Sequence, residues 1–262
     1  ACRLCGLDVE RLFLDPGQDF ALTFDELEKR LTEPSLVFLG QPNNPTGISF
    51  SGQRLRDLAG KHPDSLFVAD EAFADFVPGL DRLYRDTPQN VIVLLSLTKF
   101  YAIPGLRSGL AVASEEKARE LSRHLPPWSM NALAQEVSSR ALLDEDYAER
   151  IRQYLPPRRQ ELAQRLSSLP GITVFPSRAN YLLCRLEGPG MDVFGLQVEL
   201  FSQNIAIRTC ADYPGLDTSY FRVAVRSDPD NDQLASALDN ALSGRSRLAR
   251  PRRAADTEPR QS

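Results

Sequence analysis

Residues 91–99 of the chain read Val91-Ile92-Val93-Leu94-Leu95-Ser96-Leu97-Thr98-Lys99. A short apolar run that stops at a polar residue is typical of a buried parallel strand, which here ends at Ser96. Lysine is scarce in this protein: its 31 basic residues include only Lys29, Lys61, Lys99 and Lys117. A reaction that needs a lysine amine therefore has few candidates. Lys99 is the one that follows a buried strand, whereas the others lie in charged helical stretches or a loop.

Similar apolar runs occur at residues 35–39, 66–69 and 109–113, and helical patterns lie among them at 23–31 and 53–59. This alternation predicts an α/β domain with a central, mostly parallel sheet. Ligands of such sheets bind at the carboxyl ends of the strands. Polar residues occupy three of those ends, namely Asn43-Asn44, Asp70 and the run from Ser96 to Lys99. We therefore expect a functional site at this edge of the sheet.

The start of the chain predicts more local features. Residues 2–9 indicate the end of a helix, a stop at Gly6 and then a strand. Thr23 is placed to cap the helix at 23–31, and Glu26 three residues later completes a capping box. The chain lacks an initiator Met and begins within an element, so we expect its natural N-terminus to lie upstream.

The second half of the chain has a different pattern. Charged helical segments run from Ser114 to about residue 169, with expected breaks at the proline pairs 126–127 and 156–157. Short strands are predicted at 172–175, 181–184, 205–208 and 220–225, before a helix at 229–242. We expect a large domain at 1–113, a smaller α+β domain at 114–243 and a disordered tail at 244–262. The tail is rich in arginine, and we expect an unstructured extension there rather than an arm for nucleic acid.

Composition excludes several classes of protein. The 262 residues are 42% hydrophobic with a formal net charge of −4, as in an ordinary soluble globular protein. No apolar run reaches the roughly 20 residues that span a bilayer, and no secretory signal opens the chain. The four cysteines are too scattered for a disulfide scaffold, and Cys2-x-x-Cys5 lacks the second ligand pair of a zinc site. We expect a cytoplasmic protein with no metal site and neither membrane nor nucleic-acid partner.

Four motifs carry a resemblance to a known family. They are Gln41-Pro42-Asn43-Asn44-Pro45-Thr46-Gly47, Ala69-Asp70-Glu71-Ala72-Phe73, Ser96-Leu97-Thr98-Lys99 and Pro104-Gly105-Leu106-Arg107. In this order and spacing the chain resembles the class I/II aminotransferases, the fold-type-I group of enzymes dependent on pyridoxal 5'-phosphate (PLP). The resemblance extends nearly to the tail. It implies a large domain with a mostly parallel sheet, incomplete at its N-terminus, and a smaller α+β C-terminal domain.

The resemblance also implies a cofactor, PLP, and assigns its ligands. Lys99 resembles the lysine that forms the Schiff base with the cofactor and later moves protons at the substrate α-carbon. Asp70 resembles the partner of the pyridinium nitrogen, and Asn44 the donor to the 3-oxygen. The cofactor phosphate is expected to bind Ser96, Thr98 and Arg107.

Substrate and partner follow from the same resemblance. Arg222 resembles the guanidinium that binds the substrate α-carboxylate. Asn180 and Arg226 are expected near the substrate, which is a small phosphorylated amino acid. Relatives are homodimers with sites at the subunit boundary, so a homodimer is expected.

Two branches of the family remain open. Phe73 and the sequences around Lys99, Trp128 and Arg222 resemble the branch that decarboxylates L-threonine O-3-phosphate to (R)-1-aminopropan-2-yl phosphate in cobalamin biosynthesis. The alternative is a histidinol-phosphate-type aminotransferase that transfers an amino group to 2-oxoglutarate. A second alternative is a truncated, catalytically inactive member, because relatives carry roughly a hundred further residues before Ala1. The intact motifs favour an enzyme.

Overall fold

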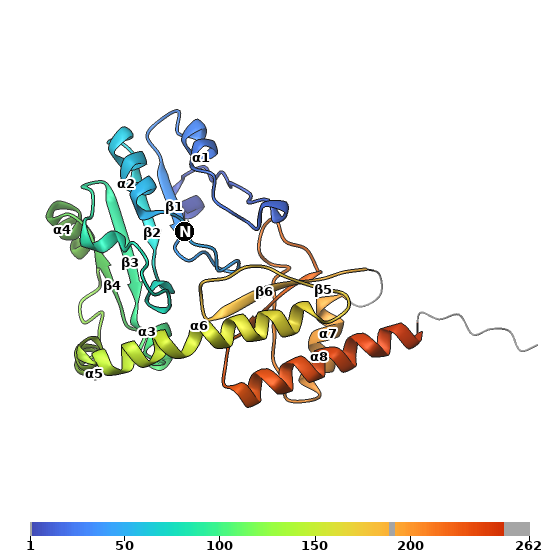
Figure 1. Ribbon diagram of the computed structural model, residues 1–262. Coiled ribbons are helices and arrows are strands. Elements are labelled where there is room, and N and C mark those ends of the chain that lie inside the picture. Colours follow the sequence, from blue (N-terminus) through green and yellow to red (C-terminus); the bar gives the residue numbers. More distant parts are fainter. Residues whose placement is uncertain (1, 189–191, 249–262) are drawn as a thin grey trace, which may run out of the picture.

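The structure is a computed structural model that describes residues 2–188 and 192–248. Its first sheet contains β1 (Leu36–Gly40), β2 (Leu66–Asp70), β3 (Val91–Ser96) and β4 (Gly109–Val112), in that order across the sheet (Figure 1). β1, β2 and β3 are parallel, whereas β4 runs antiparallel to β3. The predicted, mostly parallel α/β sheet is therefore confirmed.

Two helices cover a face of this sheet. α1 (Phe24–Arg30) and α2 (Gly52–Lys61) turn apolar side chains toward it, and Phe24, Leu55 and Leu58 pack in one cluster with Phe67 of β2. The predicted positions of β2 and β3 follow from this packing, because three consecutive residues of each strand are buried. In β2 and β3, burial on both faces removes the polar alternation, so each strand is a continuous apolar run. β1 is an equally apolar run, although its residues Leu36 and Phe38 are exposed.

The second sheet is antiparallel. It has the order β5 (Ile172–Val174), β6 (Tyr181–Leu186), β8 (Tyr220–Ala224) and β7 (Arg208–Thr209). One face packs on the helices α6 (Glu145–Ser167), α7 (Val193–Phe201) and α8 (Asp228–Leu248). The opposite face of β6 and β8 carries Tyr181 and Arg222.

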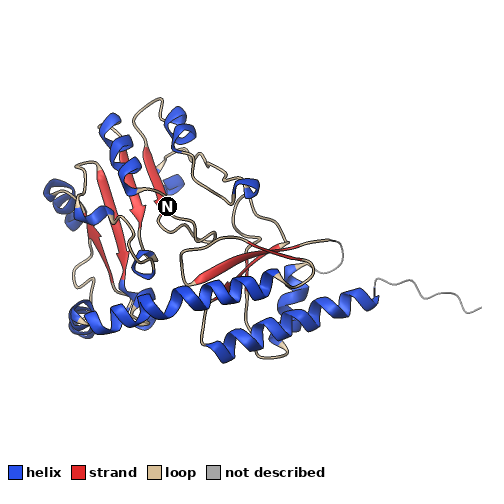
Figure 2. Ribbon diagram, in the orientation of Figure 1, coloured by secondary structure: helices blue, strands red, loops and turns tan. Residues whose placement is uncertain are grey.

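The long helix α6 links the two halves of the molecule (Figure 2). Its buried residue Leu155 belongs to the same apolar cluster as Phe76 and Phe100, which come from the first half of the chain. Tyr147, also on α6, donates a hydrogen bond to the carbonyl oxygen of Phe100 (2.9 Å). The remaining helices are α3 (Leu97–Phe100), α4 (Glu115–His124) and α5 (Ala132–Leu143), and short 3-10 turns occupy Cys2–Cys5, Pro16–Gln18, Ala74–Phe76, Leu83–Arg85 and Pro104–Leu106.

Several local predictions were wrong at the start of the chain. Residues 7–9 are not a strand, because nothing in the described chain pairs with them, although Gly6 does end a 3-10 turn with φ of +76°. Thr23 is the N-cap of α1, but its side chain makes no capping hydrogen bond, so the capping box with Glu26 does not form.

Others were wrong in the second half. Pro156 and Pro157 lie inside α6, whose buried residues Leu155 and Leu162 hold the helix together across them. The strand expected at 205–208 is reduced to the two residues of β7. The tail predicted to be disordered from Gly244 is helical to Leu248 in α8, and the rest of it lies outside the described residues.

β1 forms one edge of the first sheet. Its side chains Leu36 and Phe38 are 40% and 57% exposed, although both are large and apolar. None of the helices in the described ranges is long and apolar enough to cross a membrane.

Candidate active site

The carboxyl ends of β1, β2 and β3 lie side by side. Gly40 and Asp70 are register partners, as are Asp70 and Leu94. The ladder continues just past the strands: the backbone N–H of Gln41 donates to the Asp70 carbonyl oxygen at 2.8 Å, and that of Glu71 to the Leu94 carbonyl oxygen at 2.8 Å. The expected convergence of the polar residues that follow these strands is therefore confirmed.

Asp70 presents its carboxylate at this edge. The side chain is exposed, and its Oδ1 accepts a hydrogen bond from the backbone N–H of Ala72 (3.0 Å). This bond fixes one oxygen within the turn after β2. The other oxygen has no hydrogen-bond partner among the described residues, so it can accept a hydrogen bond from a ligand.

Side chains that can donate hydrogen bonds to a phosphate lie at the end of β3 and just after it. The hydroxyls of Ser96 and Thr98 lie 2.8 Å apart, and Thr98 is buried. Ser96 pairs in register with Gly109, only two residues after Arg107, so the register brings Arg107 back toward Ser96. Lys99 is exposed on α3, the short helix that begins directly after Ser96. Two hydroxyls and a guanidinium are suitable partners for a phosphate dianion.

Asn44 lies where the two halves of the chain meet. Its Oδ1 accepts hydrogen bonds from the Arg222 guanidinium and from the Tyr213 hydroxyl, the latter at 3.3 Å. With the oxygen end of the amide engaged in this way, the NH₂ end is the one that can donate to a ligand. Asn44 and Arg222, predicted on separate motifs 178 residues apart, are therefore in direct contact.

Tyr181 supports the Arg222 side chain. The guanidinium carbon of Arg222 lies 4.7 Å from the centre of the Tyr181 ring. The Tyr181 hydroxyl donates to the carbonyl oxygen of Asn43 at 2.9 Å. Burial raises the pKa of Tyr181, so the phenol stays protonated and keeps this bond at neutral pH. The sequence places Tyr181 in a predicted strand and indicates no role for it.

Arg208 is a second guanidinium that sequence analysis missed. It lies on β7 directly opposite Arg222 on β8, so both side chains leave the same face of the sheet. It is exposed and forms an ion pair with Asp212 at 2.5 Å. The sequence places Arg208 at the end of a predicted strand at 205–208, but it does not show that this strand pairs with β8 and so sets Arg208 opposite Arg222.

A buried ion-pair network anchors the turn after Asp70. Arg82 donates through Nε to the buried carboxylate of Glu71 and through a terminal nitrogen to Asp75, each at 2.6 Å. The other Glu71 oxygen accepts from the backbone N–H of Leu83 at 3.0 Å. These charges raise the pKa of Arg82 against the opposing effect of burial. Sequence analysis did not identify this network, although Glu71 directly follows a predicted site residue.

The two remaining candidates for substrate binding, Asn180 and Arg226, lie in different surroundings. Asn180 precedes β6, and its buried Oδ1 has no hydrogen-bond partner in the described part of the chain. An orphaned buried acceptor is costly unless a ligand satisfies it. Arg226 follows β8, is exposed, and pairs with Asp230 at 3.1 Å. Its role toward a substrate stays a prediction.

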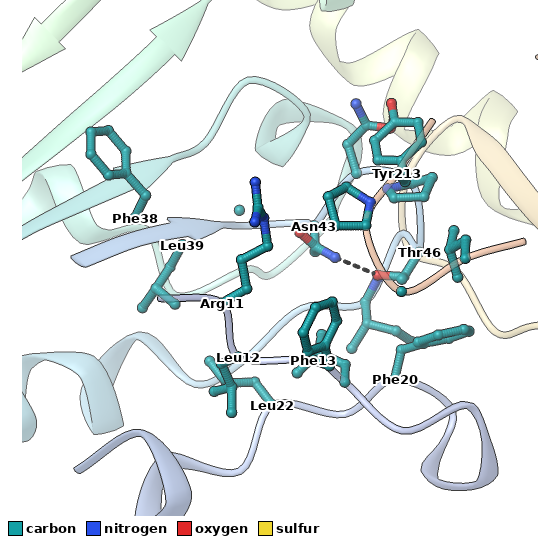
Figure 3. Close-up of a pocket in the computed structure, with 18 of the residues that line it drawn as sticks. Arg11, Leu12, Phe13, Phe20, Leu22, Phe38, Leu39, Asn43, Thr46 and Tyr213 are labelled. Atoms are coloured by element: carbon teal, nitrogen blue, oxygen red, sulfur yellow. Dashed lines mark hydrogen bonds between the residues drawn. The ribbon is translucent and has the colours of Figure 1, made fainter. Parts of the chain in front are cut away.

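A cavity of about 370 Å³ lies beside this site (Figure 3). It is bounded by the extended segment 10–14, the end of β1 and the loop 213–216. Asn43, Asn44 and Tyr213 line it, but the described residues around it do not include Lys99, Asp70 or Arg222. The cavity therefore adjoins the polar site across the 41–47 turn and is not the site itself.

Comparisons with known proteins agree with this arrangement. A threonine-phosphate decarboxylase from Salmonella typhimurium is 41% identical over 245 residues, which cover 91% of this chain and 66% of that protein. A histidinol-phosphate aminotransferase from Caldanaerobacter subterraneus subsp. tengcongensis is 34% identical over 211 residues, covering 80% of this chain and 58% of that protein. This chain thus spans less than two thirds of the length of these relatives.

The fold agrees as well. The crystal structure of L-threonine-O-3-phosphate decarboxylase from Porphyromonas gingivalis matches with a TM-score of 0.74 at 27% identity, covering 80% of this chain and 65% of that one. The family model described as aminotransferase class I and II matches residues 1–239, a range that contains all four motifs and the contact between Asn44 and Arg222. The chain therefore belongs to the class I and II aminotransferase family, which uses pyridoxal 5'-phosphate.

Proposed function

We propose that this protein is a PLP-dependent lyase that decarboxylates L-threonine O-3-phosphate to (R)-1-aminopropan-2-yl phosphate, a step of cobalamin biosynthesis. The observation that carries the proposal is the pair of guanidinium groups, Arg222 and Arg208, opposite each other on one face of the small sheet. The substrate has two anionic groups, a carboxylate and a phosphate, and guanidinium is suited to both. The 41% identity to a threonine-phosphate decarboxylase supports the same assignment.

The residues present fit PLP. The cofactor needs an amine, a carboxylate for its ring nitrogen and donors for its phosphate, and Lys99, Asp70 and the Ser96–Thr98 hydroxyl pair provide these types at neighbouring strand ends. Arg107 adds a fixed positive charge for the phosphate. When bound, PLP withdraws electrons from the substrate α-carbon through its protonated ring.

Each side chain then has a definite task. Asp70, a carboxylate with one oxygen held by Ala72, keeps the proton on the ring nitrogen. Asn44 would donate a hydrogen bond from its NH₂ group to the 3-oxygen of the cofactor, since its own oxygen accepts hydrogen bonds from Arg222 and Tyr213. Lys99 holds the cofactor and afterwards moves a proton to the α-carbon.

The reaction requires that the carboxylate be held in one direction. The bond from the α-carbon to the carboxylate would break with its electron pair left at the carbon, where bound PLP would withdraw it. Arg222 is the residue proposed to hold the carboxylate, with the Tyr181 ring beneath its guanidinium. Carbon dioxide leaves and the carbon takes up one proton, which balances the reaction.

A second candidate is a histidinol-phosphate-type aminotransferase, favoured by the 34% identity to an enzyme of that name. The same residues would serve both reactions, because in the aminotransferase Lys99 would remove the α-proton and the carboxylate would stay on the substrate. Arg208 and Arg222 also fit 2-oxoglutarate, which carries two carboxylates. For either candidate we propose a cytoplasmic homodimer.

The experiment is an assay of CO₂ release from O-phospho-L-threonine. The whole gene product, including any residues encoded before Ala1, is loaded with PLP and compared with Lys99→Ala. Release by the first protein and none by the variant supports the decarboxylase. Lys61→Ala is the matched control, because Lys61 only pairs with Glu28 at 2.9 Å on the surface, and it should retain full activity.

Two outcomes would contradict the proposal. No CO₂, with conversion of the cofactor to its amine form by histidinol phosphate, would establish the aminotransferase. No PLP binding and no turnover of either substrate would favour a catalytically inactive member of the family.

A further inference from the structure

A short segment, residues 177–180, joins the small sheet to the 41–47 turn, and we call it the strap. The backbone N–H of Arg178 donates to the Gly47 carbonyl oxygen at 2.8 Å. Within the strap the Ala179 N–H donates to the Ser177 hydroxyl at 3.1 Å. At its end, the Asn180 carbonyl oxygen accepts from the Val225 N–H at 2.9 Å. The strap thus contacts both the 41–47 turn, which contains Asn44, and the residue that follows β8.

One side chain of α6, Arg159, donates hydrogen bonds to the strap. A terminal nitrogen of Arg159 donates to two successive strap carbonyls, that of Arg178 at 3.0 Å and that of Ala179 at 3.3 Å. Within the described ranges no carboxylate forms an ion pair with this guanidinium, which is unusual for a half-buried charge. Burial and the like charge of Arg178 lower the pKa of Arg159. Among the described contacts, the hydrogen bonds to the two strap carbonyls are those that offset the partial burial of this charge.

The strap leads directly into the substrate side of the site. Asn180, its last residue, has the orphaned buried Oδ1, and the next residue, Tyr181, carries the ring beneath Arg222. A displacement of the strap therefore moves both the amide of Asn180 and the support of Arg222. Lys99 and Asp70 lie on α3 and β2 and make no hydrogen bond to the strap among the described contacts.

We propose that Arg159 is a positioning residue for substrate binding: by holding two carbonyls of the strap it fixes Asn180 and, through Tyr181, the guanidinium of Arg222. This inference rests on the proposed function, in which Arg222 binds the substrate carboxylate. Arg159 touches neither substrate nor cofactor, so its removal should weaken binding of the substrate and leave attachment of the cofactor unchanged.

The test is Arg159→Met in the PLP-loaded whole gene product. We expect the KM for O-phospho-L-threonine to rise about tenfold or more, with kcat within about threefold, because a misplaced anchor mainly costs binding. The visible absorption of the bound cofactor should not change. Arg159→Lys, which can still donate to a carbonyl, should restore most of the lost affinity. Hydrogen exchange at the amides of Arg178 and Val225 should be faster in Arg159→Met.

Arg158→Met is the matched control. Arg158 is the neighbour of Arg159 on α6, but it pairs with Asp228 at 2.8 Å and lies over the Tyr154 ring at 3.6 Å. The Arg158→Met variant should leave KM and the hydrogen exchange of the strap amides unchanged. The proposal is overturned if Arg159→Met leaves KM and strap exchange as in the parent protein, or if Arg158→Met changes them equally. If the parent releases no CO₂, the proposed function fails, and strap exchange in the two variants still decides the role of Arg159.

Discussion

At the scale of single residues, Asp70 has one carboxylate oxygen bound to its own turn and the other available to a ligand. Asp70→Asn keeps the size of the side chain but removes the negative charge that holds a proton on the ring nitrogen. We expect kcat/KM to fall about 100-fold or more, because the ring nitrogen loses a charge-assisted hydrogen bond and the nearby negative charge. Steady-state assays measure this change, and Asp64→Asn, which alters a surface carboxylate, is the control. Equal activity of both variants would remove Asp70 from the mechanism.

Gly47 allows the 41–47 turn to pack closely against the strap. Its φ is +74°, and a Cβ atom there would lie 2.1 Å from the Ser177 hydroxyl oxygen. Gly47→Ala should therefore destabilise the protein by about 2 kcal/mol or more and should separate the strap from the turn. Gly60→Ala is the matched control: Gly60 lies in α2 with open space around it, and this change should stabilise by about 0.5–1 kcal/mol. Urea denaturation distinguishes the two, and a Gly47→Ala protein as stable as the parent would contradict the model of the strap.

At the scale of elements, the turn after β2 depends on the buried network of Arg82. Arg82→Met leaves the buried Glu71 carboxylate without its cation, and we expect a loss of about 3–5 kcal/mol in the free energy of unfolding. Arg54→Met, which breaks the exposed pair with Asp25, should cost less than about 1 kcal/mol. Denaturant titration of both proteins measures the difference. Similar small losses in the two would show that the network contributes little.

Strands and helices that depend mainly on their own residues could be predicted from the sequence. The apolar runs that became β2 and β3 follow from burial on both faces of the sheet, and the apolar run of β1 was recognised although Leu36 and Phe38 are exposed. α6 could not be predicted across Pro156 and Pro157, because its continuity depends on buried leucines that contact distant parts of the chain. Arg208 and Tyr181 were missed for the same reason, since their roles arise from pairing between strands. Lys99, Asp70 and Asn44 were found through motifs, and their chemical roles remain predictions.

At the scale of the whole molecule, buried thiols and phenols make stability depend on alkaline pH. Burial raises the pKa of Cys210 to about 11, and it also raises the pKa values of Cys184, Tyr101 and Tyr147. An unfolded thiol loses its proton near pH 8.5, whereas folded Cys210 keeps it, so the unfolded state binds fewer protons above that pH. The free energy of unfolding should therefore fall as the pH rises from about 8.5 to 11, by at most about 1.4 kcal/mol per pH unit for each buried thiol. The buried phenols should add to this decline only above about pH 10, where an unfolded phenol loses its proton.

Urea denaturation between pH 7 and 10.5 measures this dependence. Cys210→Ala should make the decline shallower than in the parent protein. Cys5→Ala, which removes an exposed thiol, is the control. A decline of the same slope with and without Cys210 would show that its burial does not influence the pH dependence.

The exposed edge at β1 has a practical consequence for handling the protein. A sheet edge leaves a row of backbone N–H and C=O groups without partners, and here it carries the exposed side chains Leu36 and Phe38. Two copies of the 262-residue chain can satisfy these groups by pairing edge to edge, and we therefore expect concentrated samples to aggregate. Phe38→Lys places a charge on this edge and should raise the concentration at which light scattering first increases.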